Sequence, residues 1–598
     1  MTKFLATTFA CLLGLTLLSA WQTPSNNDWK DKISTSLLDR LEQEEQVDFL
    51  IRLRQQADLS AAKNFKNKEA KGRYVYQQLQ QLAKSSQQNL IQLLDAQEAP
   101  HRSFFVVNAI HAKGNFALIR LLAQQEEVAS IENNPQVSFD RPIEEEVVAD
   151  LRGGTAIEWG ISMIKADSVW EMGYRGQNVV VAGQDTGYDW THPSLQSKYR
   201  GMSDDGPVDH NYNWHDAIRE INPLHGDSST DPSLNPCGLD VKIPCDDNNH
   251  GTHTMGTIVG EDGENQIGVA PEAKWIACRN MERGYGTPAT YIECYEFFLA
   301  PTDLEGENAN PDMAPHVINN SWGCPELEGC NSSNWATMEA VINNLKAAGV
   351  VVVVSAGNSG RGGCETVNTP SAIYENSFSI GATASNDTIA SFSSRGPVTV
   401  DGSNRMKPNV SAPGVRVRSA VRGDGYRSFS GTSMAGPHVA GAVALIISAN
   451  PALAGRVDMI EDILEQTAVP KTTDEVCGTT PGTEVPNNTY GFGRIDVLEA
   501  VKLALNTQVV DTEEPLVEGN LQVFPNPTEG QLYLEMAQLK GQTQFELYAA
   551  DGRLVLQSRW VLQGKDRQTV DMSALPKGIY FYRLHSDQHS LSGRVVRQ

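Results

Sequence analysis

The fold is decided by the segment Gly431-Thr432-Ser433-Met434-Ala435-Gly436-Pro437-His438, which runs directly into Val439-Ala440-Gly441-Ala442-Val443-Ala444-Leu445-Ile446-Ile447. The second stretch is apolar on every side, which is typical of a helix buried in the core of a large domain. Ser433 would then lie at the N-terminus of this helix, where the macrodipole and free backbone N–H groups favour developing negative charge. A helix-capping serine would give the same local pattern, so Ser433 alone does not indicate chemistry.

Outward from this segment, apolar β-rich runs alternate with helical stretches. Such continuous apolar strands are expected in a parallel sheet that is covered by helices on both faces. The sequence therefore predicts an α/β domain over residues 156–505. Its clearest strands are expected at 179–182, 275–277, 317–319 and 350–354.

Two further motifs give Ser433 a chemical context. Asp185 directly follows a predicted strand, at the edge of the sheet where open α/β domains bind ligands. His250 begins the motif His-Gly-Thr-His. A serine hydroxyl needs a base to become a nucleophile, and the base needs an acid to fix its tautomer. Asp, His and Ser in this chain order form one of the known triads, so we predict Asp185, His250 and Ser433 as catalytic residues.

A zinc site is the alternative for the two histidines of this motif. His250 and His253 are three residues apart and have no glutamate between them, unlike the zinc motif His-Glu-x-x-His. We therefore expect no metal in the active site and a structural role for His253.

Together these motifs resemble the subtilisin-like serine proteases, or subtilases. Asp-Thr-Gly at Asp185, His-Gly-Thr-His at His250 and Gly-Thr-Ser-Met-Ala at Ser433 match the three signatures of that family, in order. The resemblance covers about residues 159–505 and includes further matches at 268–271, 391–397, 412–414 and 490–493. It implies a subtilisin-like parallel sheet and an endopeptidase that hydrolyses proteins and peptides through an acyl-enzyme, with no cofactor required.

The resemblance also implies an oxyanion hole and a substrate-binding segment. Asn358 matches the family's oxyanion-hole asparagine, although an asparagine between glycines is also typical of a turn. Ser321, Trp322 and Gly323 match the segment that pairs with the substrate backbone and walls the primary specificity pocket. Trp322 stands where the family often has a smaller apolar residue, which leaves the size of the pocket open.

Asp185 and His250 are 65 residues apart (250 − 185), more than in the compact bacterial members of the family. We expect the extra residues to form a surface insertion near the cleft. Asp246 and Asp247 in this insertion are candidate ligands for a structural Ca²⁺, although acidic loops are usually only solvated.

Composition and the N-terminus indicate an exported protein. The 598-residue chain has a net charge of −25, which argues against nucleic-acid binding. Residues 1–20 have the basic start, apolar run and small-residue end of a signal peptide, and the run is short for a membrane anchor. Eight cysteines remain after Cys11, and disulfides are expected; the pairs Cys237 with Cys245 and Cys324 with Cys330 are close in sequence.

Residues 21–150 precede the α/β domain and hold a small α+β unit at about 45–140. Strands are predicted at 47–51, 103–107 and 128–139, and helices at 67–95 and 115–126. The unit resembles the inhibitory propeptides of subtilases, which leave their C-terminal tail in the active site. We expect residues 138–151 to be that tail and self-cleavage to occur between about 140 and 156.

An acidic linker at 506–519 leads into residues 520–598, which alternate in a β pattern and predict a β-sandwich. This unit resembles type A sorting domains of type IX secretion, through Val-Phe-Pro-Asn-Pro at 523–527 and the strands at 578–582 and 594–596. The resemblance implies recognition by the outer-membrane secretion machinery. A carbohydrate- or surface-binding module is the alternative.

Two other functions are compatible with the same domain. A catalytically dead binding protein on a protease scaffold is disfavoured, because all three triad residue types and Asn358 are present. Acyl transfer or peptide ligation would use the same site, and added amine nucleophiles would reveal it in the products.

Overall fold

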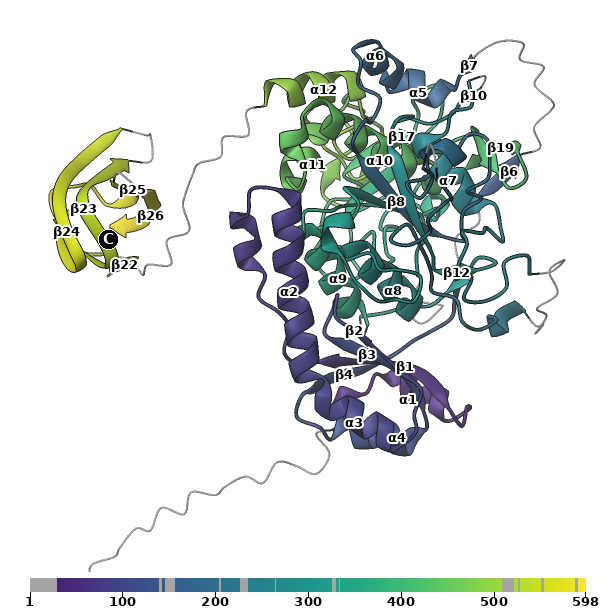
Figure 1. The fold of residues 1–598 in the computed structure, drawn as a ribbon. Coiled ribbons are helices and arrows are strands. Elements are labelled where there is room, and N and C mark those ends of the chain that lie inside the picture. Colours follow the sequence, from purple (N-terminus) through teal and green to yellow (C-terminus); the bar gives the residue numbers. More distant parts are fainter. Residues whose placement is uncertain are drawn as a thin grey trace, which may run out of the picture. The chain divides into compact units, whose positions relative to one another are not determined.

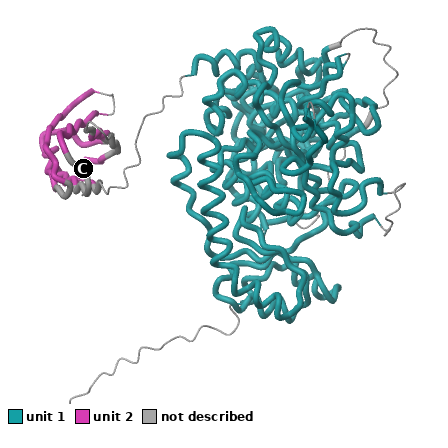
Figure 2. Tube along the Cα trace, in the orientation of Figure 1, with its two compact units in different colours: residues 1–507 teal, residues 508–598 magenta. Residues whose placement is uncertain are grey.

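The computed structural model describes residues 29–138, 142–145, 156–203, 206–225, 235–263, 265–324, 330–332, 334–507, 521–524, 528–549, 553–586 and 590–597. The predicted signal peptide and most of the acidic linker lie outside these residues. The chain divides into two compact units, residues 1–507 and 508–598 (Figure 2).

The α/β domain is built on seven parallel strands in the order β17-β16-β15-β14-β8-β11-β9 (Figure 1). Their bounds are β8 Val180–Asp185, β9 Trp214–Asp216, β11 Lys274–Arg279, β14 Val317–Asn320, β15 Val351–Ser355, β16 Phe378–Thr383 and β17 Val410–Pro413. Strands β14 to β17 are buried along their whole length, as expected for a sheet covered on both faces. The predicted α/β class and parallel sheet are confirmed.

Helices cover the two faces of this sheet. On one face α10 (Thr432–Ala449) contacts β8 and β14 to β17, beside α7 (His250–Val259) and α12 (Val497–Asn506). On the other face α8 (Pro288–Leu299) and α9 (Trp335–Ala347) pack into a large apolar core. The remaining helices are α5 Trp159–Met163, α6 Ala166–Glu171 and α11 Val457–Gln466. Among the described helices, α10 alone is long and apolar enough to cross a membrane, but 94% of it is buried inside the fold.

The insertion between Asp185 and His250 is more than the predicted surface loop. Its residues Trp214–Asp216 form β9, which extends the parallel sheet beyond β11. The Trp214 side chain is buried, and its indole N–H donates to the Val241 carbonyl within the same insertion. The segment thus lies at an edge of the sheet and also contributes a buried side chain to the core, which the expected surface insertion did not include.

The N-terminal unit folds around its own apolar core and an antiparallel sheet in the order β2-β3-β1-β4. Its elements are α1 Thr35–Leu41, β1 Val47–Leu53, α2 Lys68–Ser86, α3 Gln88–Ala96, β2 His101–Phe104, β3 Ala109–Gly114, α4 Phe116–Ala123 and β4 Val128–Asn133. The predicted helix at 67–95 is broken at Gln87. The Gln87 side chain is buried and donates to the Phe104 carbonyl (2.9 Å) and to Asn108 Oδ1 (2.8 Å).

The predicted strand at 103–107 is wrong in its second half. β2 ends at Phe104, and residues 105–108 form turns instead. Val106 and Val107 are nevertheless fully buried, in the same apolar cluster as α8 and α9 of the α/β domain. The apolar run that suggested a strand is therefore a loop that docks against the α/β domain.

The C-terminal unit is all-β, as predicted. Its strands are β22 Leu521–Phe524, β23 Gln531–Ala549, β24 Leu554–Asp571, β25 Gly578–Ser586 and β26 Ser590–Arg597. They pair antiparallel into one continuous sheet, in which the long β23 pairs with β24 on one side and with β22 and β25 on the other. Residues from both halves of β23 contribute to a single apolar core.

Four disulfides join the eight described cysteines. The pairs are Cys237–Cys245, Cys278–Cys294, Cys324–Cys330 and Cys364–Cys477. The two short-range pairings suggested by the sequence are both present.

Candidate active site

Three elements of the α/β domain bring the predicted triad residues to one end of the sheet. Asp185 is the last residue of β8, an inner strand that lies between β14 and β11. His250 is the first residue of α7, and Ser433 is the second residue of α10. Asp185 and His250 are about 1% exposed, and Ser433 is 2% exposed.

Asp185 and His250 form a direct pair. His250 Nδ1 lies 2.7 Å from Asp185 Oδ1 and 2.9 Å from Oδ2. The Thr186 N–H also donates to Oδ1 at 2.8 Å, which holds the carboxylate in place. Because the carboxylate can only accept, Nδ1 of a neutral His250 ring carries the proton in this contact.

Ser433 does not act as a helix cap. The N-cap residue of α10 is Gly431, which has no side chain with which to cap the helix. The Ser433 hydroxyl donates instead to the Ser321 carbonyl (3.4 Å), and the Ser321 hydroxyl donates to the Ser433 carbonyl (3.2 Å). These two hydrogen bonds hold the start of α10 against the segment that follows β14. The Ser433 side chain therefore does not cap the helix.

Asn358 follows β15 and reaches the start of α10. Its Oδ1 accepts hydrogen bonds from the Thr432 N–H (2.9 Å) and the Thr432 hydroxyl (3.0 Å). Because the oxygen is fixed in this way, the Nδ2 side of the amide is turned away from Thr432. Nδ2 lies 3.7 Å from the place where a Cβ on Gly431 would stand, so the amide group lies beside the turn that leads into Ser433.

His253 lies one turn after His250 on α7 and is fully buried. Its ring stacks on Phe429 (4.3 Å between centroids), and its Nε2 lies 3.0 and 3.1 Å from the carbonyls of Val417 and Arg427. Burial lowers the pKa of His253 to about 3, so the ring is neutral. With Nε2 donating to the backbone, the ring has the structural role predicted for it rather than that of a zinc ligand.

The segment Ser321–Gly323 lies along the site, directly after β14. The Trp322 ring is 4% exposed and stacks on Tyr291 of α8, with 3.9 Å between ring centroids. It also lies near Tyr295, and all three rings belong to the large apolar core. The bulk of Trp322 is therefore accommodated against α8.

The tail of the N-terminal unit passes along both sides of this site. Upstream, β5 (Val137–Ser138) pairs antiparallel with β13 (Tyr285–Gly286). Downstream, β6 (Ile143–Glu145) pairs antiparallel with β19 (Gly425–Ser430), the strand that leads into Gly431 and Ser433. Pro142 Cβ is 3.6 Å from the Cβ position of Gly431. The described residues before and after 139–141 are thus held by β13 and by the strand that precedes Ser433.

Asp246 is a site residue whose role the sequence did not suggest. Its carboxylate accepts from the Thr186 hydroxyl (2.9 Å), from the N–H groups of Asn248 and Asn249, and from the Thr252 N–H and hydroxyl. Thr186 follows Asp185, whereas the other donors surround His250. Asp246 therefore ties the turn after Asp185 to the N-terminus of the helix that carries His250.

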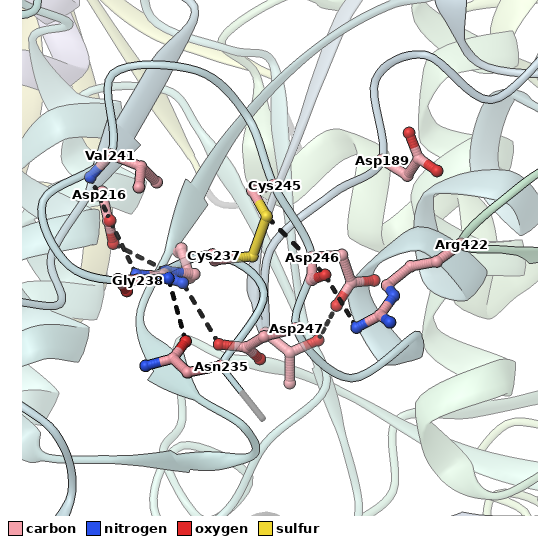
Figure 3. The surroundings of a disulfide bond; sticks show 12 residues. Asp189, Asp216, Asn235, Cys237, Gly238, Val241, Cys245, Asp246, Asp247 and Arg422 are labelled. Carbon is pink, nitrogen blue, oxygen red and sulfur yellow. Dashed lines mark hydrogen bonds and ion pairs between the residues drawn. A yellow bond between two sulfur atoms is a disulfide. The ribbon is translucent and has the colours of Figure 1, made fainter. Parts of the chain in front are cut away.

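The two carboxylates proposed as calcium ligands do not fit that role. Asp246 is occupied by five protein donors, and Asp247 bonds Arg279 (3.3 Å) and the Arg283 N–H (2.9 Å). Figure 3 shows them beside the Cys237–Cys245 disulfide. Asp216 forms a second ion pair to the buried Arg279. Ca²⁺ takes six to eight oxygen ligands. Within the described ranges, no group of three or more His, Cys, Asp or Glu residues could hold a metal ion.

Replacing Asp246 by alanine is expected to lower kcat about 10- to 100-fold and the free energy of unfolding by about 3 kcal/mol. The substitution leaves buried donors unpaired and releases His250 from its position. Equilibrium unfolding in a Ser433→Ala background, which avoids autolysis, measures the stability; peptide hydrolysis measures kcat. Glu220→Ala removes an exposed acid from the same insertion and should change neither value. An unchanged kcat in the Asp246 variant would show that the network does not position His250.

Comparison with known proteins agrees with this geometry. Residues 176–493 match the subtilase family, and residues 522–598 match a secretion system C-terminal sorting domain. Bacillopeptidase F of Bacillus subtilis (strain 168) is 36% identical over 526 residues, which are 83% of this chain and 34% of the relative. The chain thus spans about a third of the length of that relative. Subtilisin E of the same organism is 32% identical over 344 residues, 57% of this chain and 72% of the relative. Alkaline protease of Alkalihalobacillus alcalophilus is 31% identical over 347 residues, 58% and 73%.

Proposed function

Because the chain belongs to the subtilase family of serine endopeptidases, we propose that it hydrolyses peptide bonds of proteins through Asp185, His250 and Ser433. The observation that carries the proposal is the buried Asp185–His250 pair, at 2.7 and 2.9 Å, at the end of the sheet where α10 begins. The segments that follow β14 and β15 also contact the start of α10, through Ser321 and Asn358. Both contacts support the assignment of Ser433 as the nucleophile.

The proposed reaction has two halves. Ser433 Oγ attacks the scissile carbonyl while His250 Nε2 accepts its proton, and Asp185 stabilises the imidazolium that forms. The Asn358 Nδ2–H and the Ser433 backbone N–H donate to the oxyanion of the tetrahedral intermediate. His250 then protonates the leaving amine, and water releases the acyl group from Ser433 by the reverse steps.

Labelling with a fluorophosphonate tests the proposal directly. The processed wild-type enzyme should become labelled at Ser433, as read by peptide mass spectrometry, and lose peptidase activity in proportion. A dead binding protein on the same scaffold would take up no label at Ser433. Addition of amine nucleophiles during hydrolysis would reveal any transfer to acceptors other than water.

We further propose that the N-terminal unit is an intramolecular inhibitor within residues 21–150, and that the peptidase proper spans 156–505. Its docking is extensive. Glu296 of α8 accepts the backbone N–H groups of Phe105 and Val106, and Arg102 pairs with Glu293 at 3.0 Å. At the far end, α2 reaches the peptidase through the buried Lys68, whose Nζ donates to the Ala314 carbonyl (2.6 Å).

Self-cleavage is proposed at one of the peptide bonds between Ser138 and Pro142. Ser138 is paired with β13, and Pro142 lies beside Gly431, two residues before Ser433. These bonds overlap only the start of the range of about 140–156 expected from the sequence. N-terminal sequencing of the first processed product should give a residue from 139 to 142; a first N-terminus beyond 145 would contradict the proposed path of the tail.

Release of the inhibitor is expected to quicken as the pH rises from 6 to 8. Burial raises the pKa of Glu296 to about 7 while the propeptide is docked, although Arg102 and the two N–H donors oppose the shift. Because the Glu296 carboxyl binds its proton more tightly in the docked state, protonation favours the complex. This contribution to docking is lost as the pH rises through 7. Burial raises the pKa of Glu293, but the neighbouring Arg102, His215 and Arg219 lower it further, to about 2. Glu293 therefore stays charged between pH 6 and 8.

The measurement is the rate at which peptidase activity appears after self-cleavage, divided at each pH by the activity of fully activated enzyme. Wild type should activate about tenfold faster at pH 8 than at pH 6. Glu296→Gln should be nearly independent of pH, whereas Glu69→Gln, which changes an exposed propeptide acid, should behave as wild type. A pH dependence that survives in Glu296→Gln would assign the effect to another group.

The C-terminal unit is a sorting domain of a secretion system, which indicates export to the cell surface or the medium. We propose that the outer-membrane machinery of type IX secretion recognises it. Deleting residues 521–598 should leave the protein in the periplasm with an intact peptidase. Export that continued without this unit would favour the alternative, a carbohydrate- or surface-binding module.

A further inference from the structure

One side chain of the inhibitory tail is completely buried against a disulfide. Val137 is 0% exposed and forms a separate apolar cluster with Cys324 (2% exposed) and Cys330 (4% exposed). These two cysteines are bonded to each other. Disulfide sulfur is apolar and polarisable, so it offers an aliphatic side chain a surface like that of a hydrocarbon core.

Val137 belongs to the tail that the proposed function places in the path of the substrate. It pairs with Gly286, and the next residue, Ser138, pairs with Tyr285. The chain ahead of Val137 is also fixed: the Ala289 N–H donates to Asn134 Oδ1 (3.0 Å), and the Asn222 amide donates to Gln136 Oε1. These contacts fix the register of the tail against the peptidase up to Ser138.

The peptidase leaves space for a side chain at this position. Directly opposite residues of an antiparallel pair direct their side chains to the same face, and the partner of Val137 is a glycine. A Cβ on Gly286 would lie 2.7 Å from the Tyr291 ring, so that ring bounds the same face. Tyr291 in turn stacks on Trp322, in the segment that leads into Cys324.

We propose that the Cys324–Cys330 disulfide is the wall of an apolar substrate subsite, which selects a medium-sized aliphatic residue at the place of Val137. This proposal rests on the proposed function and specifies the substrates of that site. The bond ties the end of the substrate-binding segment back on itself, so the wall exists only while the bond is intact. Its reduction would open the wall and abolish the selection without removing any group that acts on the scissile bond.

The test uses processed wild-type enzyme and quenched peptides with the sequence of residues 136–145, Gln-Val-Ser-Phe-Asp-Arg-Pro-Ile-Glu-Glu. The Val position is replaced by Ala, Gly or Asp. We expect kcat/KM for Val to exceed that for Ala about tenfold, since two buried carbon atoms distinguish them. In the double variant Cys324→Ser/Cys330→Ser this ratio should fall to about threefold or less, while the Gly peptide, which places no side chain in the subsite, keeps its kcat/KM.

Loss of a disulfide also destabilises a protein, and the pair Cys364–Cys477 provides the control. Cys364→Ser/Cys477→Ser removes a bond that closes 113 residues of chain but should leave the Val-to-Ala ratio at its wild-type value. If the Cys324/Cys330 double variant does not fold, mild reduction of folded wild type, with the Gly peptide as internal standard, gives the same ratio.

A Val-to-Ala ratio that stays near tenfold without the Cys324–Cys330 bond would overturn the proposal. This result is distinct from failure of the proposed function, in which even the Gly peptide would be cleaved as fast by Ser433→Ala as by wild type.

Discussion

Replacing Ser433 by alanine is expected to lower kcat about 10⁶-fold and to leave the inhibitory tail uncut. The hydroxyl oxygen is the proposed nucleophile, and water cannot take its place with the same alignment to His250. Alanine suits the second position of α10, where the neighbouring residues are buried and the Ser433 hydroxyl makes only a long contact of 3.4 Å. The variant should therefore fold as the wild type does.

Peptide hydrolysis measures kcat, and intact mass shows whether the chain is cut between Ser138 and Pro142. Ser448→Ala is the matched control, because Ser448 lies on the same helix and its hydroxyl bonds Gln177 at a distance from the site. That variant should keep the activity and processing of wild type. Trimming of purified Ser433→Ala at the same bonds, with no other protease present, would show that self-cleavage is wrong.

Replacing Asp185 by alanine is expected to lower kcat about 10⁴-fold. Without the carboxylate the His250 ring loses both contacts at 2.7 and 2.9 Å, which fix its tautomer and orientation. The imidazolium formed during attack also loses its counter-charge in a buried site, where charges are poorly screened. KM should change much less than kcat, because Asp185 does not contact the substrate.

Asp189→Ala is the control for this variant. The Asp189 carboxylate lies nearby but accepts from Thr191 and from the Gly423 N–H rather than from His250. Its loss should cost less than tenfold in kcat. A similar loss of kcat in both variants would mean that negative charge near His250 supports catalysis, rather than the specific Asp185–His250 pair. Full activity of Asp185→Ala would exclude Asp185 from the triad.

Local pattern was enough to predict the strands that carry the site. The runs at 179–182, 275–277, 317–319 and 350–354 all became strands of the parallel sheet, because strands buried on both faces must be continuously apolar. The same rule failed at 103–107, where Val106 and Val107 are buried by another unit rather than within a sheet. The apolar run correctly predicted that these two valines are buried. It did not predict that they pack against the α/β domain, and so it gave the wrong backbone conformation.

The sequence by itself determined the family, the order of Asp185, His250 and Ser433, and the helix at whose start Ser433 lies. These features depend on residue type and on periodicity over a few neighbouring positions. Only the tertiary structure decided that Asp246 ties Asp185 to His250, that Glu296 receives the propeptide loop, and that Val137 is buried against Cys324 and Cys330. Those contacts join residues 60 to 191 or more positions apart. No local pattern encodes them, because packing between distant segments is specified by the shape of the whole fold rather than by the periodicity of either segment.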